Sequence, residues 1–317
     1  MPGESKVNII EIKSLTKRFG SFTAVNNMNL NVREKEIFGF LGPNGAGKTT
    51  TISMLTTLIK PTSGTALING YDIVNQGVKI REIIGVVPQT FALFPELTAE
   101  ENLEYIGKLY GLSNSVIKER TENLLKIVSL YEHRNRIAGI FSGGMKQRLS
   151  LATSIISNPK ILFMDEPTTG LDPQSRIAIR QLTKRLNSQG MTIIYTTHDM
   201  DEADKICDRI TIMDNGRIVA DGTSQELKNM ISDGKTIEVE LESVTPEILS
   251  ELKKLPYITS VEKSDNLIYI KVKAKDGVFY KLSDFFHRRK IKVDEIKFKE
   301  HTLEDVFIQL TRKDLRD

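Results

Sequence analysis

The sequence predicts an α/β protein with a parallel sheet at its centre, followed by a small second α+β domain. A short apolar run at residues 36–41 leads into a glycine-rich loop and then into a helical pattern. Strand and helix patterns then alternate as far as residue 198, an order that places parallel strands side by side with helices over them. After residue 234 the composition changes and the patterns form a second, self-contained set.

The elements of the first domain follow from hydrophobic periodicity. Strands are expected at 7–15, 24–32, 36–41, 81–89, 160–167 and 191–198, and helices at 48–58, 98–112, 115–130 and 173–189. In the first of these helices Ile52, Leu55 and Leu58, with Met54, fall on one apolar face. Asn215-Gly216, between two short apolar segments within 209–222, predicts a β-hairpin.

The second domain shows the order strand, helix, strand, strand, helix, strand. These segments span 236–242, 245–255, 258–263, 266–274, 277–290 and 291–299, and a last helix is expected at 302–312. The order is ferredoxin-like. We therefore expect domains at 1–232 and 235–317.

The composition excludes several classes of protein. The 317 residues are 39% hydrophobic and 27% charged, which is typical of globular chains and not of disordered or fibrous ones. No apolar stretch is long enough to span a bilayer, and residues 1–13 lack the pattern of a signal peptide. The 44 basic and 41 acidic residues are mixed along the chain, so we expect no nucleic-acid partner. The single cysteine, Cys207, fits a packing role in a cytoplasmic protein.

A phosphate-binding loop is the strongest chemical signal. Residues 42–49 match G-x-x-x-x-G-K-[ST] at every position and lie between a predicted strand and a predicted helix. Loop N–H groups and the helix N-terminus bind phosphate, Lys48 reaches the β- and γ-phosphates, and the Thr49 hydroxyl binds Mg²⁺. The alternative, a glycine-rich turn capped by threonine, does not explain the complete pattern.

Polar residues also follow several predicted strands. Asp165 and Glu166 end the strand at 160–167, where Asp165 can hold Mg²⁺ through water and Glu166 can orient the attacking water. Gln89, His198 and Asp172 also lie near strand ends, and singly each is a common turn or capping residue. Because the carboxyl ends of parallel strands share one crevice, we expect Gln89 and His198 to face the γ-phosphate.

A second glycine pair occurs in "FSGGMKQR", residues 141–148. Ser142, Gly143 and Gly144 lead into a helical pattern, so they form a second helix N-terminus able to bind an anion. Alone, such a segment is as often a capped turn.

Taken together, the motifs resemble those of the ATP-binding cassette (ABC) ATPases, the motor subunits of ABC transporters. "GPNGAGKTT" resembles Walker A, "FSGGMKQR" the signature, "ILFMDEP" Walker B with its catalytic Glu, "TGLD" the D-loop and "TTH" the H-loop. The departure is Phe141, where the family most often has leucine, and we expect it to alter packing and not chemistry. The resemblance implies an antiparallel β subdomain and a helical subdomain at about 90–158 beside the P-loop core.

The resemblance also assigns roles. It implies that Glu166, His198 and Gln89 are catalytic and that Asp172 is the D-loop residue. It implies Thr49, Gln89 and Asp165 as Mg²⁺ ligands and Phe19 as the residue that stacks on the adenine. The residues implied around the ATP phosphates are Gly42, Pro43, Asn44, Gly45, Ala46, Gly47, Lys48, Thr49 and Thr50. Ser142, Gly143 and Gly144 would cap the γ-phosphate of ATP held by a second copy of the chain. The implied assembly is a head-to-tail homodimer that holds ATP at two composite sites.

The implied partner is a separate transmembrane permease that docks near Gln89 and the segment 90–112, with the motor on the cytoplasmic face of the membrane. The tail, in which Leu303, Val306, Phe307 and Leu310 share one helix face, resembles the ATPases of drug-resistance and ABC-2 exporters, the daunorubicin-resistance group among them. An exporter of drugs or other hydrophobic compounds is the leading hypothesis.

Three alternatives stay open at this point. An importer motor would share the cassette, but in sugar importers the extra domain is a small β-barrel. A non-transport ABC ATPase of DNA repair or translation would usually show two cassettes, a long coiled-coil insertion or a basic arm. A phosphotransferase kinase with the same phosphate loop would not explain "FSGGMKQR" or His198.

Overall fold

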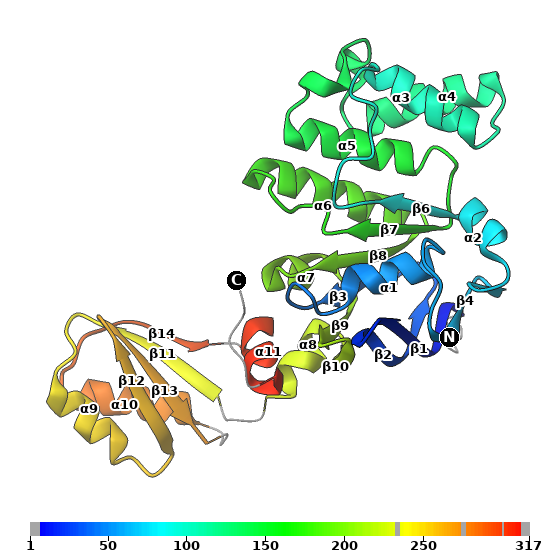
Figure 1. The fold of residues 1–317 in the computed structure, drawn as a ribbon. Helices are drawn as coiled ribbons and strands as arrows, with labels where there is room; N and C mark the ends of the chain where they lie inside the picture. Colours follow the sequence, from blue (N-terminus) through cyan, green and yellow to red (C-terminus); the bar gives the residue numbers. More distant parts are fainter. Residues whose placement is uncertain (1–6, 232–234, 274–276, 300, 312–317) are drawn as a thin grey trace, which may run out of the picture. The chain divides into compact units, whose positions relative to one another are not determined.

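The computed structural model describes residues 7–231, 235–273, 277–299 and 301–311, and these form two compact units (Figure 1). The first unit contains the described residues up to Leu227 together with those from Phe307 onward, and the second runs from Lys228 to Val306. The boundary that the sequence places at 232–235 falls largely outside the described residues, so it stays a prediction.

The first unit is built on a six-stranded sheet of order β10-β9-β3-β8-β7-β6. Its strands are β3 (Ile37–Leu41), β6 (Ile84–Val87), β7 (Ile161–Asp165), β8 (Thr192–Thr197), β9 (Arg209–Asp214) and β10 (Arg217–Gly222). All are parallel except β10, which pairs with β9 as the predicted hairpin. Asn215 and Gly216 have φ angles of 48° and 73°, as a tight hairpin turn requires.

The sheet separates two hydrophobic cores because side chains alternate along its strands. Phe40, Phe163 and Ile194 point into one core, with residues of α1 (Lys48–Leu55). Their strand neighbours Leu162 and Ile193 belong to the other core, with residues of α5 (Gly143–Ser154), α6 (Pro173–Ser188) and α7 (Met200–Ile206). The phosphate-loop helix and the signature helix therefore pack on opposite faces of one sheet.

An antiparallel sheet of order β2-β1-β4-β5 shares the core of α1. Its strands are β1 (Asn8–Phe19), β2 (Phe22–Arg33), β4 (Ser63–Ile68) and β5 (Tyr71–Asp72), of which the last two were not predicted. The prediction of a helix to Leu58 was wrong, because α1 ends at Leu55 and Thr57 adopts a left-handed φ of 63° that terminates it. Leu58 is 72% exposed.

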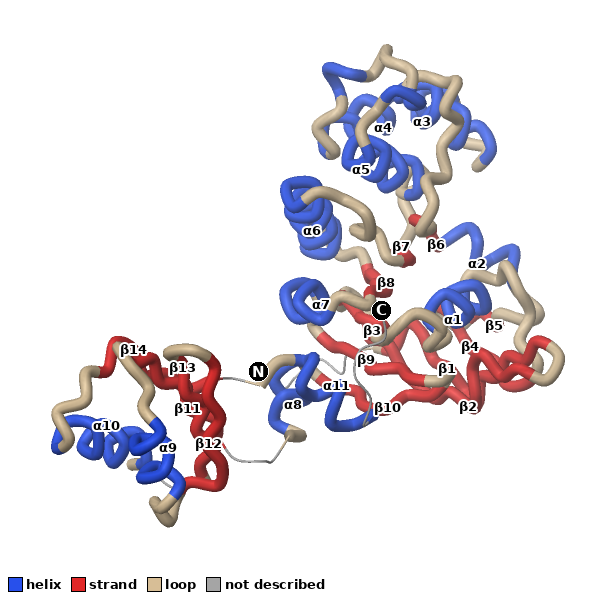
Figure 2. The backbone as a smooth tube through the Cα atoms, turned by 60° about the vertical axis from the view of Figure 1, so that its left-hand side comes forward, coloured by secondary structure: helices blue, strands red, loops and turns tan. Residues whose placement is uncertain are grey.

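A helical part comprises α3 (Ala99–Leu109), α4 (Asn114–Ile127) and α5, which Figures 1 and 2 show grouped at one end of the first unit. Thr98 and Glu101 form a reciprocal capping box at the start of α3, which satisfies two N–H groups of the helix end and its cap. Short elements complete the unit: α2 (Gly77–Ile83), two 3₁₀ turns at Tyr131–His133 and Ala138–Ile140, and the first residues of α8 (Ser224–Asn229).

The second unit has the predicted ferredoxin-like order. It consists of β11 (Lys235–Leu241), α9 (Pro246–Lys253), β12 (Ile258–Ser264), β13 (Leu267–Val272), α10 (Val278–Arg288) and β14 (Val293–Lys299). The antiparallel sheet has the order β12-β13-β11-β14, and both helices cover one of its faces (Figure 2). Ile237, Ile270 and Phe286 form part of its core. The last helix, α11 (Leu303–Thr311), follows.

Within the described residues, no helix combines the length and the hydrophobicity needed to cross a bilayer.

The assignment of the tail can be tested with two buried phenylalanines. Phe307 of α11 is 2% exposed and belongs to the first unit, and Phe286 of α10 is 1% exposed and belongs to the second. Each Phe→Ala change should cost about 3–5 kcal/mol of stability because it leaves a cavity. Hydrogen-deuterium exchange should show the loss of protection in the first unit for Phe307→Ala and in the second for Phe286→Ala. Loss confined to residues 235–299 in both variants would contradict the assignment.

Candidate functional site

The phosphate loop lies between β3 and α1, and its backbone is fixed on several sides. Gly45 and Gly47 have left-handed φ angles of 82° and 102°, which favour glycine. A Cβ atom on Gly47 would lie 2.5 Å from the backbone oxygen of Ala24, and one on Gly42 would lie 2.3 Å from that of Met213. The N–H of Gly216, in the β9–β10 turn, donates to the Ala46 oxygen at 3.0 Å. The loop conformation therefore depends on both sheets.

Lys48 is the first residue of α1, and its side chain is only 4% exposed. Its Nζ donates to the backbone oxygens of Gly42 at 2.7 Å and Pro43 at 3.2 Å. The same nitrogen lies 3.2 Å from Oε1 of Glu166. The ammonium group is thus held in the hollow of the loop, where a phosphate would compete with Glu166 for it.

Glu166 follows β7 in a left-handed conformation, with φ 46°. Its N–H donates to the Thr196 hydroxyl at 2.9 Å, its Oε2 accepts from the Thr169 hydroxyl at 3.1 Å, and Nδ1 of His198 lies 2.9 Å from Oε2. Burial raises the pKa of Glu166, but the charge and hydrogen bond of Lys48, with His198 and Thr169, outweigh it and hold the pKa below its usual value. The carboxylate is therefore ionised at neutral pH.

Asp165 is the last residue of β7 and is buried. Its Oδ1 accepts from the hydroxyl of Thr196 at 2.6 Å and from that of Thr49 at 3.3 Å. A carboxylate oxygen and a hydroxyl oxygen thus meet beside the phosphate loop, and oxygen atoms are the ligands that Mg²⁺ prefers. The described residues include no group of three or more His, Cys, Asp or Glu side chains suited to a metal ion.

The signature residues lie away from this cluster in space, beside the D-loop residue Asp172. Ser142 caps α5 and accepts from the N–H of Met145 at 3.3 Å. A Cβ atom on Gly144 would lie 2.0 Å from the hydroxyl oxygen of Ser175, which donates to Asp172, the N-cap of α6. Phe141 is buried and packs edge-on against His133. Figures 1 and 2 both show α5 well separated from α1.

The remaining predicted residues lie at the surface. Gln89 is exposed two residues after β6. Phe19 ends β1, is 52% exposed, and its ring centroid lies 5.1 Å from Nζ of Lys17. The structure thus brings together Lys48, Thr49, Asp165, Glu166 and His198.

Sequence reasoning missed four side chains around this cluster. Thr196 bonds Asp165 and the Glu166 backbone, Thr169 bonds Glu166, and Thr168 bonds the buried Glu202. The pair Thr196-Thr197 at the end of an apolar strand was a usable signal, since a buried hydroxyl needs a partner. Nothing in the pattern "DMDEAD" marks Glu202 among its acidic neighbours.

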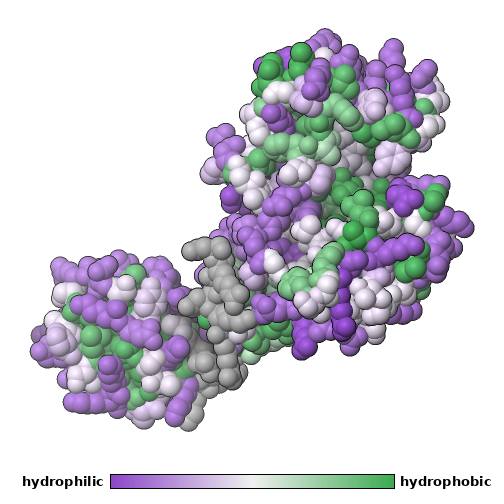
Figure 3. All heavy atoms as spheres, in the orientation of Figure 1, coloured by the Kyte–Doolittle hydropathy of each residue, from purple (hydrophilic) through white to green (hydrophobic). Residues whose placement is uncertain are grey.

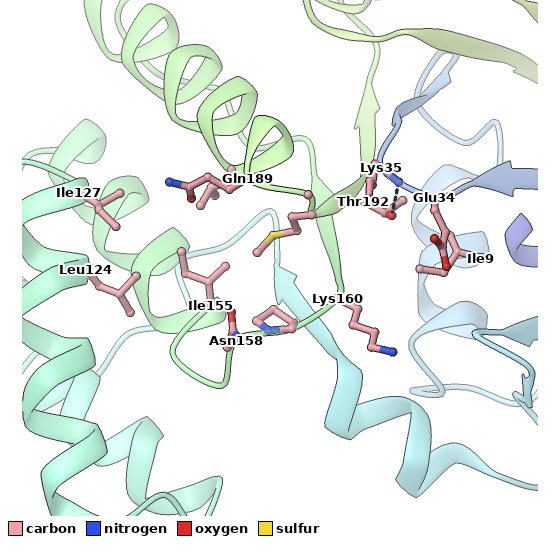
Figure 4. A pocket seen from close by; sticks show the side chains of 14 residues that line it. Ile9, Glu34, Lys35, Leu124, Ile127, Ile155, Asn158, Lys160, Gln189 and Thr192 are labelled. Atoms are coloured by element: carbon pink, nitrogen blue, oxygen red, sulfur yellow. Dashed lines mark hydrogen bonds between the residues drawn. The ribbon is translucent and has the colours of Figure 1, made fainter. Parts of the chain in front are cut away.

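A separate pocket of about 500 Å³ opens at the other end of the strands (Figure 4). It is lined by Leu124, Ile127, Ile155, Lys160, Gln189 and Thr192 among others. Thr192 begins β8, whereas the site residues follow the carboxyl ends of β7 and β8. None of the predicted site residues lines this pocket.

Comparison with known proteins agrees with the motifs. Residues 25–169 match the family model "ABC transporter", and residues 222–311 match "ATP-binding protein DrrA1-3-like, C-terminal domain". A linearmycin resistance ATP-binding protein of Bacillus subtilis is 37% identical over 98% of this chain and 100% of its own length. The chain belongs to the ABC transporter family of ATP-binding proteins. A Nod factor export ATP-binding protein of Ralstonia nicotianae is 36% identical over 100% of this chain and 98% of its own.

Solved ABC structures share the cassette fold. An ATP-binding subunit of an ABC transporter superposes with a TM-score of 0.64 at 31% identity, covering 70% of this chain and 92% of its own. A dimeric ATP-binding cassette in a post-hydrolysis state, bound to ADP and Pi, gives 0.62 at 32% identity, covering 68% and 98%. This chain is accordingly an ATPase and an ABC ATP-binding subunit homologous to drug-resistance and export ATPases. Such subunits dimerise and work with transmembrane subunits.

Two glycines of the ABC phosphate loop provide a matched test. Gly47→Ala should destabilise the cassette and abolish ATP binding, because its Cβ would collide with a backbone oxygen that cannot yield. A Cβ atom on Gly45 has no protein atom within 4 Å, so Gly45→Ala should cost only about 1–2 kcal/mol of stability, for its left-handed backbone. Denaturant unfolding and calorimetric titration with ATP measure both effects. Equal losses in the two variants would show that steric contact with Ala24 does not shape the loop.

Proposed function

We propose that this chain is the ATP-hydrolysing motor of an ABC exporter for drugs or other hydrophobic compounds. It acts as a head-to-tail homodimer with a separate transmembrane permease, on the cytoplasmic face of the membrane. The observation that carries the proposal is the division of its motifs. Lys48, Glu166 and His198 form one cluster, and the signature residues lie on the opposite face of the sheet with Asp172.

Glu166 is the catalytic residue that orients and polarises the attacking water. Before ATP binds, Lys48 and His198 hold its pKa below the usual value, so the carboxylate is ionised at neutral pH, as a water-positioning carboxylate must be. His198 lies against its Oε2 and holds the side chain toward the phosphate loop. Lys48 exchanges its contact with Glu166 for the β- and γ-phosphates when ATP binds, so nucleotide binding frees the carboxylate for water. Gln89 and Phe19 are assigned to the γ-phosphate region and to the adenine.

A magnesium ion fits beside these groups. The hydroxyl of Thr49 and the carboxylate of Asp165 lie 3.3 Å apart and would hold it together with phosphate oxygens, water and Gln89. Mg²⁺ is usually bound this way, through one or two protein ligands plus substrate phosphates. When bound, the ion neutralises charge on the transferring phosphoryl group.

The second half of each ATP site comes from the other copy. Ser142 starts α5, so the N–H groups of Gly143 and Gly144 lie at a helix N-terminus with its partial positive charge. In a head-to-tail dimer this terminus faces the γ-phosphate held by the partner. ATP then closes the interface, and hydrolysis removes the phosphate that holds it closed.

The permease docks in a hollow between the helical part and the sheet. This pocket of about 640 Å³ is lined mainly by apolar side chains, including Leu58, Val86, Pro88, Ile106, Leu109 and Tyr110. Leu58 and Leu109 are 72% and 66% exposed, and Figure 3 shows hydrophobic surface gathered between these two parts of the cassette. Pro88 adjoins Gln89, so a segment bound here would lie next to the residue assigned to the γ-phosphate region.

Export is favoured over import by the second unit and the relatives. The second unit is ferredoxin-like, not a β-barrel, and it matches the C-terminal domain of DrrA-like proteins. A daunorubicin/doxorubicin resistance ATP-binding protein of Streptomyces peucetius is 42% identical over 70% of this chain and 67% of its own. A non-transport role is less supported, since the relatives cited are named for resistance or export.

Glu166→Gln tests the water-polarising role. The amide keeps the shape of the side chain but cannot polarise water as a carboxylate does, so ATP should still bind while kcat falls by about 10²-fold or more. The variant should accumulate as an ATP-bound dimer, visible by size-exclusion chromatography with Mg-ATP. Near-normal hydrolysis by this variant would remove Glu166 from the mechanism.

A mixing experiment tests the composite site. Lys48→Ala removes charge that neutralises phosphate, and Ser142→Arg places a bulky cation where the backbone must approach ATP. Neither variant should dimerise with itself. If Ser142 acts across the interface, a mixed dimer contains one site with both defects and one intact site, so mixing should restore ATP-dependent dimerisation.

The assay is size-exclusion chromatography with ATP in a Glu166→Gln background, which slows turnover. Circular dichroism of each variant confirms folding before they are mixed. If Ser142 instead serves the ATP of its own chain, no mixture recovers a dimer, and the head-to-tail arrangement is refuted.

A further inference from the structure

Glu202 is a buried carboxylate that the mechanism above does not use. It lies in the first turn of α7, directly after the His198 segment, and is only 5% exposed. The Tyr195 hydroxyl donates to its Oε1 at 3.0 Å, and the Thr168 hydroxyl donates to its Oε2. Burying a carboxylate is costly unless hydrogen bonds satisfy it, and both of these donors come from other elements: β8 and the segment after β7.

Thr168 belongs to the turn that carries Glu166. The N–H of Thr169 donates to the Glu166 oxygen at 3.2 Å, and the N–H of Leu171 donates to the Thr168 oxygen at 3.2 Å. Glu166 itself has a left-handed φ of 46°. A residue with a side chain keeps that backbone conformation only where its surroundings hold it. The hydrogen bond from Thr168 to Glu202 holds the turn in place two residues after Glu166, whose backbone conformation is unfavourable.

A second tie joins the same segment to α7. Nε of Arg176 donates to the Leu171 oxygen at 3.1 Å, and its NH1 group lies 3.4 Å from Oδ2 of Asp199. Asp199 is the N-cap of α7 and accepts from the N–H of Glu202 at 3.0 Å. His198 and Glu202 thus contact the segment 166–171 directly, through Glu166 and Thr168, and Asp199 is linked to Leu171 indirectly, through Arg176.

We infer that Glu202 is a positioning residue for ATP hydrolysis: through the Thr168 hydroxyl it holds the turn that aims Glu166 at the phosphate loop and sets the start of the D-loop. The inference rests on the proposed role of Glu166. Glu202 touches neither nucleotide nor water in this role. Its effect should therefore be on turnover and not on ATP binding.

The two hydroxyls that donate to Glu202, those of Thr168 and Tyr195, provide a matched experiment in the full-length chain. Thr168→Val and Tyr195→Phe each remove one donor from the same buried carboxylate, so both should lower Tm. Thr168→Val releases the turn of Glu166 directly, whereas Tyr195→Phe leaves the hydrogen bond from Thr168 to Glu202 in place. We expect Thr168→Val to lower kcat by about tenfold to a hundredfold, the cost of misplacing a reacting group, with KM for ATP unchanged. Tyr195→Phe should retain the kcat of the unmodified chain, and Thr168→Ser, which keeps the hydroxyl, should retain it too.

Three results would overturn the inference: an unchanged kcat in Thr168→Val, an equal loss of kcat in Tyr195→Phe, or a Thr168→Ser variant as slow as Thr168→Val. Should Thr168→Val fail to fold, Thr168→Ala takes its place, since it leaves room for a water on Glu202 that is not tied to the turn. Glu166→Gln in the same assay separates the two claims. If that variant hydrolyses ATP normally, the role of Glu166 fails; if it is inactive while Thr168→Val is fully active, only the role of Glu202 fails.

Discussion

The site depends on one buried ion pair, between Lys48 and Glu166. Their charged atoms lie 3.2 Å apart, and the two side chains are 4% and 7% exposed. Desolvating two charges costs several kcal/mol per ion, which their attraction offsets only when further hydrogen bonds satisfy both groups. Lys48 obtains them from loop carbonyls, and Glu166 obtains them from Thr169 and His198. The pair is stable only if the loop after β3 and the ends of β7 and β8 all occupy fixed positions.

The parallel sheet fixes those positions, and the hydroxyl of Thr196 links the end of β8 to the end of β7. Thr196, at the end of β8, donates to the carboxylate of Asp165 and accepts from the N–H of Glu166. Adjacent residues of a strand point to opposite sides, but the left-handed backbone at Glu166 changes the direction of the chain immediately after β7. Asp165 is thereby directed to Thr49 and Glu166 to Lys48. The carboxylates proposed to hold Mg²⁺ and to polarise water are thus placed next to each other, Asp165 beside Thr49 and Glu166 beside Lys48.

The sequence predicts the parts of this arrangement that short patterns encode. Gly45 and Gly47 are required by local backbone conformation, and Asn215-Gly216 by the geometry of a tight turn, so each is visible in a few consecutive residues. The order of strands and helices in the second unit was predictable because the apolar residues within each segment recur at the spacing typical of a strand or of a helix. Leu58 was misplaced because the left-handed Thr57 ends α1 without a glycine or proline to mark it. Thr168 and Glu202 meet only when the turn after β7 lies against the first turn of α7, 34 residues further along the chain, and no local pattern records such a pair.

Two helix N-termini of this chain are proposed to contact phosphate, and the same sheet holds them apart. α1 packs in the core that contains Phe40, Phe163 and Ile194, whereas α5 and α6 pack in the core that contains Leu162, Met164 and Ile193. Because neighbouring strand residues face opposite sides, these two cores cannot merge without breaking the sheet. Contact between Gly144 and Ser175 further fixes the signature to the start of α6, beside Asp172. The helix end at Ser142 is therefore held beside Asp172 and away from the Lys48 of its own chain, and this separation supports the proposal that the phosphate it binds is held by a second copy.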